Sequence, residues 1–305
     1  MTLNGSSNTD KTTIVLAGAT GDLGGRIARF LLRRGAHVRA VVRPESDSKK
    51  VTALRHKGVE VVESNYKSVS ELAKACAGGA CVVSALSGLE EVILETQRIL
   101  LYAAVEAGVP RFIPSDYAID FTRLPEGSNR NLDLRREFHR RLDKTPIKAT
   151  SVLNGMFTEL LTGQAPFILF PLKRVIYWDD PDQPMDFTTM DNTADFTAAA
   201  ALDASAPRFL RIAGDVRSAR GLKEAASEAT GEEFKLVRAG SLGMLDTIIK
   251  ITRTLYPSNH EVYPPWQGMQ YMHNMFSGLP KLEPLDNGRY PGIAWTGVPE
   301  VLARR

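Results

Sequence analysis

Short apolar runs alternate with stretches of helical period along the first half of the chain. Each run is rich in Val, Ile or Ala, and the stretch that follows repeats its apolar residues three or four positions apart. Such alternation predicts a doubly wound parallel sheet in an α/β fold, since each helix returns the chain for another parallel strand. The predicted strands cover 14–17, 37–42, 58–63, 80–86 and 111–114, and the predicted helices 26–33, 69–77 and 90–107.

The alternation weakens in the second half of the chain. The sequence predicts a polar loop over 120–131, a charged helix over 133–144 and a sixth strand over 147–153. After Leu161, prolines interrupt the pattern. A strand near 208–213 is predicted to return to the sheet, and Ser218 to cap a helix that ends at Thr230. The sequence therefore predicts a Rossmann-type domain over 12–160 and a smaller C-terminal substrate region over 161–305, not cleanly separable from it.

The turn after the first predicted strand contains three glycines, in the spacing Gly18-x-x-Gly21-x-x-Gly24. A first glycine permits the tight turn, a second lets the backbone approach a pyrophosphate, and a third lets the helix pack closely on the sheet. The diphosphate would then lie on free N–H groups at the helix N-terminus. This turn, between a strand and an amphipathic helix, predicts a dinucleotide site.

The end of the second predicted strand indicates which dinucleotide. Enzymes that use NAD place an acidic residue there, and enzymes that use NADP place an arginine near the 2′-phosphate. Arg43 occupies that position, and Lys49 follows on the same loop or first helical turn. A guanidinium suits a phosphate because it donates two parallel hydrogen bonds. The sequence favours NADP(H), although Glu45 or Asp47 could instead turn toward a ribose hydroxyl.

Charge and composition exclude several other classes of function. Lys and Arg total 38 against 35 Asp and Glu, giving a formal net charge of +3, and the two signs are interspersed, so no nucleic-acid surface is predicted. The two cysteines, Cys76 and Cys81, are predicted to be buried reduced thiols. The five histidines show no His-x-x-x-His spacing, and neither a Cys-x-x-Cys pair nor a Gly-x-Ser-x-Gly elbow occurs, so no metal site or hydrolase is expected.

The chain shows no sign of a membrane segment. Its first eleven residues are polar and predict a frayed tail rather than a signal peptide. No apolar stretch is long enough to span a bilayer, which makes a cytoplasmic location the expectation.

The chain contains a recognisable set of segments, GATGDLG, AVVRPES and RFIPSDYAID, which are followed by a charged helix and an NGMF turn. It resembles the NmrA-like and isoflavone-reductase-like branch of the atypical short-chain dehydrogenases over about residues 12–235. The resemblance implies an NADP(H)-binding Rossmann fold, and it assigns roles by position. It implies that the glycine turn binds the pyrophosphate and that the ends of the fourth and fifth strands contact the nicotinamide. It also implies that the NGMF turn contacts the substrate. The implied cofactor-binding residues are Gly18, Thr20, Gly21, Asp22, Leu23, Gly24, Arg43, Lys49, Asn65, Ser84, Ala85, Leu86, Ser115 and Tyr117, and the implied substrate-binding residues are Asn154, Met156 and Phe157.

One departure from that family pattern concerns the reaction itself. Reductases of this branch carry a lysine at the start of the helix after the loop, but residues 131–139 contain none, and the short-chain Tyr-x-x-x-Lys pair is also absent. Arginine cannot replace lysine in proton transfer, because its pKa lies above about 12. The candidates that could donate a proton or stabilise an oxyanion are Tyr117, Arg135 and His139.

Two hypotheses follow. The first is an NADPH-dependent reductase that transfers hydride to a conjugated or aromatic small molecule in an apolar cleft. The second is a non-catalytic NADP(H)-binding redox sensor of the NmrA type, whose conformation a partner protein reads. The missing lysine favours the sensor, and the aromatic-rich C-terminal stretch favours the enzyme. A sugar epimerase or dehydratase is a more distant alternative, since those reactions depend on the absent Tyr and Lys.

Overall fold

A parallel six-stranded sheet forms the centre of the computed structural model, which describes residues 11–305. All but Lys11 of the predicted frayed tail therefore lies outside the described residues. The strand order is β3-β2-β1-β4-β5-β6, and it reverses direction between β1 and β4, which confirms the predicted doubly wound sheet. The strands are β1 (Thr13–Ala17), β2 (His37–Val42), β3 (Glu60–Glu63), β4 (Cys81–Ser84), β5 (Arg111–Ile113) and β6 (Lys148–Ala149).

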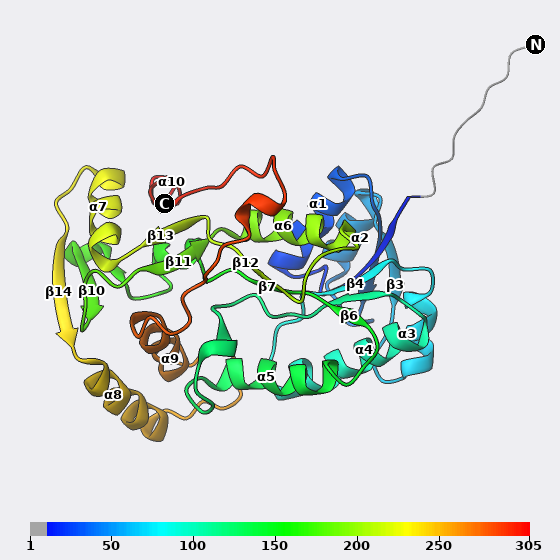
Figure 1. Ribbon diagram of the computed structural model, residues 1–305, viewed down its shortest axis with the longest axis horizontal. Coiled ribbons are helices and arrows are strands. Elements are labelled where there is room, and N and C mark those ends of the chain that lie inside the picture. Colours follow the sequence, from blue (N-terminus) through cyan, green and yellow to red (C-terminus); the bar gives the residue numbers. More distant parts are fainter. Residues whose placement is uncertain (1–10) are drawn as a thin grey trace, which may run out of the picture.

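Helices cover both faces of this sheet (Figure 1). Because side chains alternate along a strand, Ile14 and Leu16 of β1 pack in one apolar cluster while Val15 and Ala17 pack in another. The first cluster lies under α1, α2 and α6, and the second under α3, α4 and α5. These helices are α1 (Asp22–Arg33), α2 (Ser48–His56), α3 (Val69–Cys76), α4 (Gln97–Glu106), α5 (Arg130–Leu142) and α6 (Met190–Leu202).

The edge of the sheet beyond β6 is built from two distant parts of the chain. The predicted strand over 147–153 forms as β6 and β7 (Ser151–Leu153), separated at Thr150. A strand from the second half, β12 (Phe209–Arg211), pairs with β7 in parallel. The two halves of the chain are therefore joined through this edge.

The C-terminal region has its own core and lies beside the carboxyl end of the sheet (Figure 1). It contains two three-stranded sheets, in the orders β14-β10-β9 and β13-β11-β8. Its strands are β8 (Met156–Phe157), β9 (Ile168–Leu169), β10 (Arg174–Trp178), β11 (Met185–Thr188), β13 (Asp215–Arg217) and β14 (Lys235–Gly240). Its helices are α7 (Ala219–Thr230), α8 (Leu242–Leu255), α9 (Pro265–Phe276) and α10 (Val298–Leu302), with short 3-10 turns at Phe121–Arg123, Thr158–Thr162, Phe170–Leu172 and Asn287–Arg289.

Several helices differ from the prediction, and α1 begins at Asp22, four residues before the predicted start at Arg26. The helix over 90–107 begins with a π-helical segment, η1 (Glu91–Thr96), before α4. The charged helix α5 begins three residues earlier than predicted, because Asn129 caps it by accepting a hydrogen bond from the Leu132 N–H at 3.2 Å. Helix α6 was not predicted, since its alanine-rich sequence is buried on nearly every side and shows no polar face.

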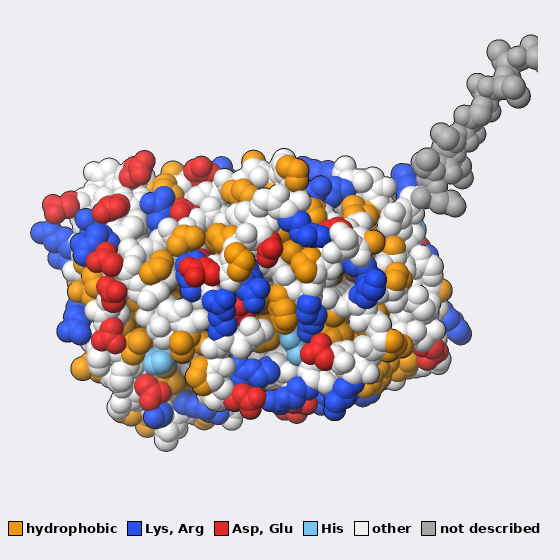
Figure 2. Space-filling view, viewed as in Figure 1, with side chains coloured by type: hydrophobic (Ala, Val, Ile, Leu, Met, Phe, Trp, Pro, Cys, Tyr) orange, Lys and Arg blue, Asp and Glu red, His pale blue; other side chains and the backbone are white. Residues whose placement is uncertain are grey.

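The surface shows no segregation of charge on the face drawn in Figure 2, where acidic and basic side chains lie intermixed. Within residues 11–305, no helix is both long and apolar enough to cross a membrane.

Two glycines of the first turn are required by the protein's own backbone. Gly18 has a φ of +84°, and a Cβ there would lie 2.5 Å from the carbonyl oxygen of Ala85. A Cβ on Gly24 would lie 2.1 Å from the carbonyl oxygen of Gly18. Helix α1 can therefore approach the end of β1 only with glycine at position 24.

We expect Gly24→Ala to lower the free energy of unfolding by about 1–3 kcal/mol, the usual cost of forcing atoms into a packed site. Gly25→Ala is the matched control, because its Cβ would lie 3.4 Å from the Ala19 oxygen, an ordinary contact. The control should be neutral or stabilised by up to about 1 kcal/mol, since alanine is the better helix former. Urea denaturation without cofactor compares the two, and equal stability would show that the close approach is not needed.

Candidate functional site

The N-terminus of α1 is open at the glycine turn. Its N-cap residue, Gly21, is in an extended conformation and makes no side-chain capping hydrogen bond. A Cβ on Gly21 would meet only the Gly18 carbonyl oxygen, at 3.3 Å, a contact that a small shift relieves. The carboxylate of Asp22 is turned to Arg26, with 2.7 Å between Oδ1 and Nε. The first-turn N–H groups are thus left free to bind the oxygens of an anion.

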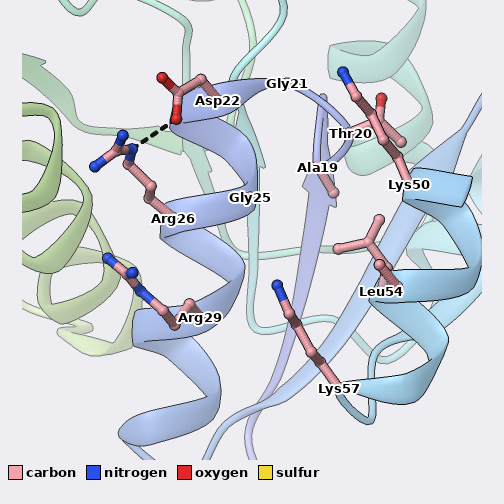
Figure 3. Close-up of a pocket in the computed structure, with 11 residues that line it drawn as sticks. Ala19, Thr20, Gly21, Asp22, Gly25, Arg26, Arg29, Lys50, Leu54 and Lys57 are labelled. Carbon is pink, nitrogen blue, oxygen red and sulfur yellow. Dashed lines mark hydrogen bonds and ion pairs between the residues drawn. The ribbon is translucent and has the colours of Figure 1, made fainter. Parts of the chain in front are cut away.

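A cavity of about 470 Å³ lies beside this turn, between α1 and α2 (Figure 3). Lys50 and Lys57 extend into it from α2, and neither has a carboxylate within 4 Å among residues 11–305. Arg26 and Arg29 also line it, but their guanidinium groups turn toward α6, where they contact Asp191 at 2.6 and 2.7 Å. The uncompensated positive charge of the cavity therefore comes from the two lysines.

The loop between β2 and α2 bears on the choice between NAD and NADP. Asp47 is the N-cap of α2, and its Oδ1 accepts hydrogen bonds from the backbone N–H groups of Lys49 and Lys50. Arg43 is exposed and only loosely paired, with 3.8 Å between its Nε and Glu45 Oε1. Lys49 is exposed and does not line the cavity, whereas Lys50 does.

Buried polar atoms without partners gather at the carboxyl ends of the strands. Ser84 at the end of β4 has a buried hydroxyl with no hydrogen bond among the described residues. Asn154, directly after β7, is fully buried, and neither its amide oxygen nor its amide nitrogen is paired. Thr158 adds a second buried hydroxyl with no partner among the described residues. Since unpaired buried polar atoms are costly, their grouping indicates that a polar ligand binds at this edge.

Other predicted cofactor residues at the strand ends are held by local hydrogen bonds. Ser115 donates from its hydroxyl to the Leu86 carbonyl oxygen at 2.7 Å, and its N–H donates to Gln97 Oε1 at 2.9 Å. Asn65, after β3, accepts the Lys67 N–H at 2.9 Å. Met156 and Phe157 form β8 and are partly exposed next to the buried Asn154. Ala85 lies against Gly18.

A buried carboxylate, Asp116, joins three elements just after β5. Its Oδ2 lies 2.6 Å from His139 Nε2 on α5, and it accepts a hydrogen bond of 2.6 Å from the Ser151 hydroxyl on β7. Burial alone would raise the pKa of Asp116, but the charge of His139 and the hydrogen bonds from His139 and Ser151 hold that pKa below its usual range. Arg208 donates to the Ser151 hydroxyl at 2.7 Å and extends the network to the next strand.

The three residues predicted to be catalytic are placed differently. Tyr117 packs in the apolar cluster on the α6 side of the sheet, and burial raises the pKa of its hydroxyl well above its usual range. His139 is 9% exposed at its side chain and held by Asp116. Arg135 donates through Nη1 to the Asn131 carbonyl oxygen at 2.8 Å, while its Nε is buried without a partner among the described residues. Arg135 and His139 thus share α5, and Tyr117 faces the other side of the sheet.

Three residues of this region, Lys57, Asp191 and Asp116, were given no role from the sequence. Lys57 directly follows α2, and Asp191 lies on α6. The sequences of these two helices do not indicate that they pack beside α1. Asp116 stands inside the RFIPSDYAID segment that was matched, but no local signal indicates that its partners are His139 and Ser151, 23 and 35 residues away.

Residues 10–283 match the model of the NmrA-like family. The chain belongs to the NmrA-like family. Pinoresinol reductase 1 of Arabidopsis thaliana is 29% identical over 229 residues, which cover 70% of each protein. This confirms the predicted resemblance.

Solved structures of reductases have the same fold as this NmrA-like chain. The structure of AtPrR2 with NADP+ and (+)-pinoresinol superposes with a TM-score of 0.79 at 20% identity, covering 97% of this chain and 99% of the other. The leucoanthocyanidin reductase–NADPH complex from Vitis vinifera gives 0.80 at 19% identity, covering 96% and 98%. At this identity the likeness establishes the fold, and the α/β prediction is confirmed.

Asp116→Asn should lower the free energy of unfolding at pH 7 by about 3–5 kcal/mol, the cost of breaking a buried pair by removing one partner. The folded-state pKa of Asp116 is depressed, so its contribution is fully present above the usual value of 3.8 and is lost as the pH falls through the folded-state pKa. The variant should therefore show a flatter loss of stability below pH 3.8.

Urea denaturation at several pH values measures this difference. Asp182→Asn is the control, because that carboxylate is exposed and pairs with Arg220 on the surface. Little change is expected for it. If the two variants were equally stable at pH 7, Asp116 would not hold α5 and β7 as described.

Proposed function

We propose that this NmrA-like protein is an NADPH-dependent reductase of a conjugated or aromatic small molecule. The observation that carries the proposal is the line of unsatisfied polar groups along the carboxyl edge of the sheet. It runs from the uncapped N-terminus of α1 past Ser84 to Asn154. In doubly wound sheets a dinucleotide lies across this edge at the point where the strand order reverses, here between β1 and β4. Two relatives that are named pinoresinol reductases support the same function.

The residues at this edge fit NADP(H). The first turn of α1 would hold the pyrophosphate through the backbone N–H groups of Asp22 and Leu23, with Thr20 beside them, since the Gly21 N–H already donates to the Gly18 carbonyl oxygen. Arg43 and Lys50 would contact the 2′-phosphate, since both are exposed basic residues on the segment that follows β2. When bound, the cofactor supplies hydride at its nicotinamide ring.

The nicotinamide end would be framed by the strand-end residues. Ser84 and Asn154 offer unpaired polar atoms, which suit a carboxamide. Met156 and Phe157 provide apolar surface on which a flat substrate could pack. The substrate would therefore lie between this edge and the C-terminal region.

Reduction also needs a group that stabilises negative charge on the substrate. We assign this role to Arg135, because its buried Nε has no partner within residues 11–305 and its charge lowers the pKa of Asp116 at the end of β5. His139 would position the segment at the end of β5 through Asp116 rather than donate a proton, since both atoms of that contact are buried. Tyr117, kept protonated by burial, remains a candidate donor if its ring turns toward the edge.

We expect Arg43→Ala to weaken NADPH binding by about 1.5–3 kcal/mol, the range for hydrogen bonds to charged groups, and to leave NADH binding nearly unchanged. Arg55→Ala is the control, because Arg55 is also exposed and makes a similarly loose contact of 3.6 Å with Glu63. Calorimetric titration with both cofactors gives the result. Equal losses for NADPH and NADH would mean that Arg43 does not read the 2′-phosphate.

Replacing the charge-stabilising group should affect turnover without affecting cofactor binding. Arg135→Leu is expected to lower turnover by about 10²-fold or more at unchanged NADPH affinity, and Tyr117→Phe and His139→Gln by less. The main effect of His139→Gln should be a lower free energy of unfolding, because the change removes the partner of the buried Asp116 carboxylate. NADPH oxidation with a panel of enones, isoflavonoids and quinones provides the assay.

The same assay separates the enzyme from the sensor. A wild-type protein that oxidises NADPH with no compound of the panel, but changes its protease sensitivity between NADP+ and NADPH, would be the sensor. In that case the assignments to Tyr117, Arg135 and His139 would be wrong.

A further inference from the structure

Helix α8 exposes a row of large apolar side chains, which are between 36 and 67% exposed. The row consists of Met244, Ile248, Ile251 and Leu255. Successive members are four, three and four residues apart, so they lie on one face of the helix. This face is not the one that α8 buries, because Leu245 and Ile249 enter the core of the C-terminal region instead. We call the four exposed residues the α8 stripe.

The α8 stripe is a concentrated feature of the surface. Helix α8 lies at the opposite end of the molecule from α3 (Figure 1). Half of the large apolar side chains that are exposed among the described residues fall between residues 237 and 256. The exposed fractions of the stripe add up to about two whole side chains, or roughly 300–500 Å². Scattered apolar side chains need no explanation, but a continuous row of this size indicates an interaction surface.

The polar residues beside the α8 stripe can be covered without losing hydrogen bonds. Thr247 and Thr254 flank it on one side, and their hydroxyls donate to carbonyl oxygens one turn earlier in α8, at 3.0 and 2.9 Å. Both hydroxyls therefore keep a partner inside the helix when water is excluded. Neither residue carries a charge, so an apolar partner surface is favoured over a charged one.

A lipid surface is not favoured as the partner. Helices that lie on anionic membranes present free Lys and Arg side chains from their polar face. In α8, Lys250 Nζ lies 2.7 Å from Asp246 Oδ2. The Arg253 guanidinium lies over the Trp266 ring, 5.0 Å from its centroid. Both cations of α8 are thus engaged within the protein.

The spacing of the α8 stripe makes it complementary to itself. Four, three and four reads the same in both directions, so two antiparallel copies of α8 place Met244 against Leu255 and Ile248 against Ile251. The same spacing defines the seam of a coiled coil. We propose that the α8 stripe is the interface of a two-fold symmetric dimer of this chain. Such an interface uses the same surface on both copies and is closed by one contact.

The size of the α8 stripe sets the expected strength of the dimer. A standard interface buries about 800 Å² on each partner, and interfaces below about 1,200 Å² in total belong to weak or transient complexes. The stripe with its flanking threonines falls in the smaller class. The dimer is therefore expected to dissociate with a Kd of about 1–100 μM.

Sedimentation velocity of the full chain without cofactor, from about 1 to 200 μM, measures this equilibrium. Ile251→Lys should raise the Kd by about 10-fold or more, because it places an unpaired charge in the seam. Leu172→Lys is the matched control, since Leu172 is 64% exposed on another element, the 3-10 turn Phe170–Leu172. It should leave the Kd unchanged. Thermal unfolding checks that both variants are folded.

Cysteine cross-linking tests the antiparallel orientation. Met244→Cys combined with Leu255→Cys should give a disulfide-linked dimer on oxidation with copper phenanthroline, because these positions face each other across the two-fold axis. Met244→Cys alone should not, since its two copies lie roughly 16 Å apart along the helix axis, whereas a disulfide spans Cα atoms at most about 7 Å apart. The native Cys76 and Cys81 are buried, so their contribution to cross-linking is small.

Three results would each overturn the dimer: a monomer at every concentration, a dimer that is unaffected by Ile251→Lys, or cross-linking by Met244→Cys alone. Vesicles of phosphatidylcholine and phosphatidylglycerol are a further comparison. If the chain stays monomeric and binds these vesicles, and Ile251→Lys abolishes that binding, the α8 stripe is a lipid-binding surface and the proposal fails. None of these measurements depends on NADPH or on turnover, so their outcome is independent of the proposed function.

Discussion

The buried carboxylate of Asp116 is the interaction on which the arrangement of the site depends. Its single Oδ2 atom contacts His139 from α5 and Ser151 from β7. A buried charge is costly unless it is paired, so these two contacts leave the elements little freedom to move apart. These contacts act together with the buried side chains of Phe138 and Leu142 to fix α5 against the sheet. The same contacts therefore position the residues of α5 that face the C-terminal region.

The start of α5 carries this constraint to the C-terminal region. Asn129, its N-cap, is also bonded to α9, through Asn274 at 3.1 Å and Gln267 at 2.7 Å. Arg130 and Asn131 both donate to the carbonyl oxygen of Val262. One helix is thus bound to the sheet through its last turn and to α9 through its start, which fixes α9 relative to the sheet without a covalent link.

The sequence predicted the parts of the molecule whose cause is local. The glycine turn was predicted with its strand and helix, because Gly18 needs a φ of +84° and Gly24 lies against the Gly18 carbonyl oxygen within one turn. The doubly wound parallel sheet follows from βα alternation, because the crossovers are right-handed. The cap of α7 at Ser218 was predicted from the side chain that accepts the Gly221 N–H. These features need no knowledge of distant residues.

The parts that could not be predicted depend on residues far apart in the chain. Helix α6 has no polar face, because it is covered by α1 on one side and by the C-terminal segment on another, so its sequence lacks the usual helical pattern. The histidine at position 139 looked like a member of a charged, solvated helix. Its burial depends on Asp116 and on the rings of Phe121 and Phe209, which contact it from two other elements. Only the fold places these groups together.

The uncompensated positive charge of the proposed site lies beside α1. Among residues 11–305, Lys50 and Lys57 line the cavity there without a carboxylate within 4 Å. The two arginines that line the same cavity are instead paired with Asp22 and Asp191. A carboxylate beside the two lysines would compete with the phosphate oxygens of a dinucleotide, so leaving these lysines unpaired favours the loaded protein over the empty one.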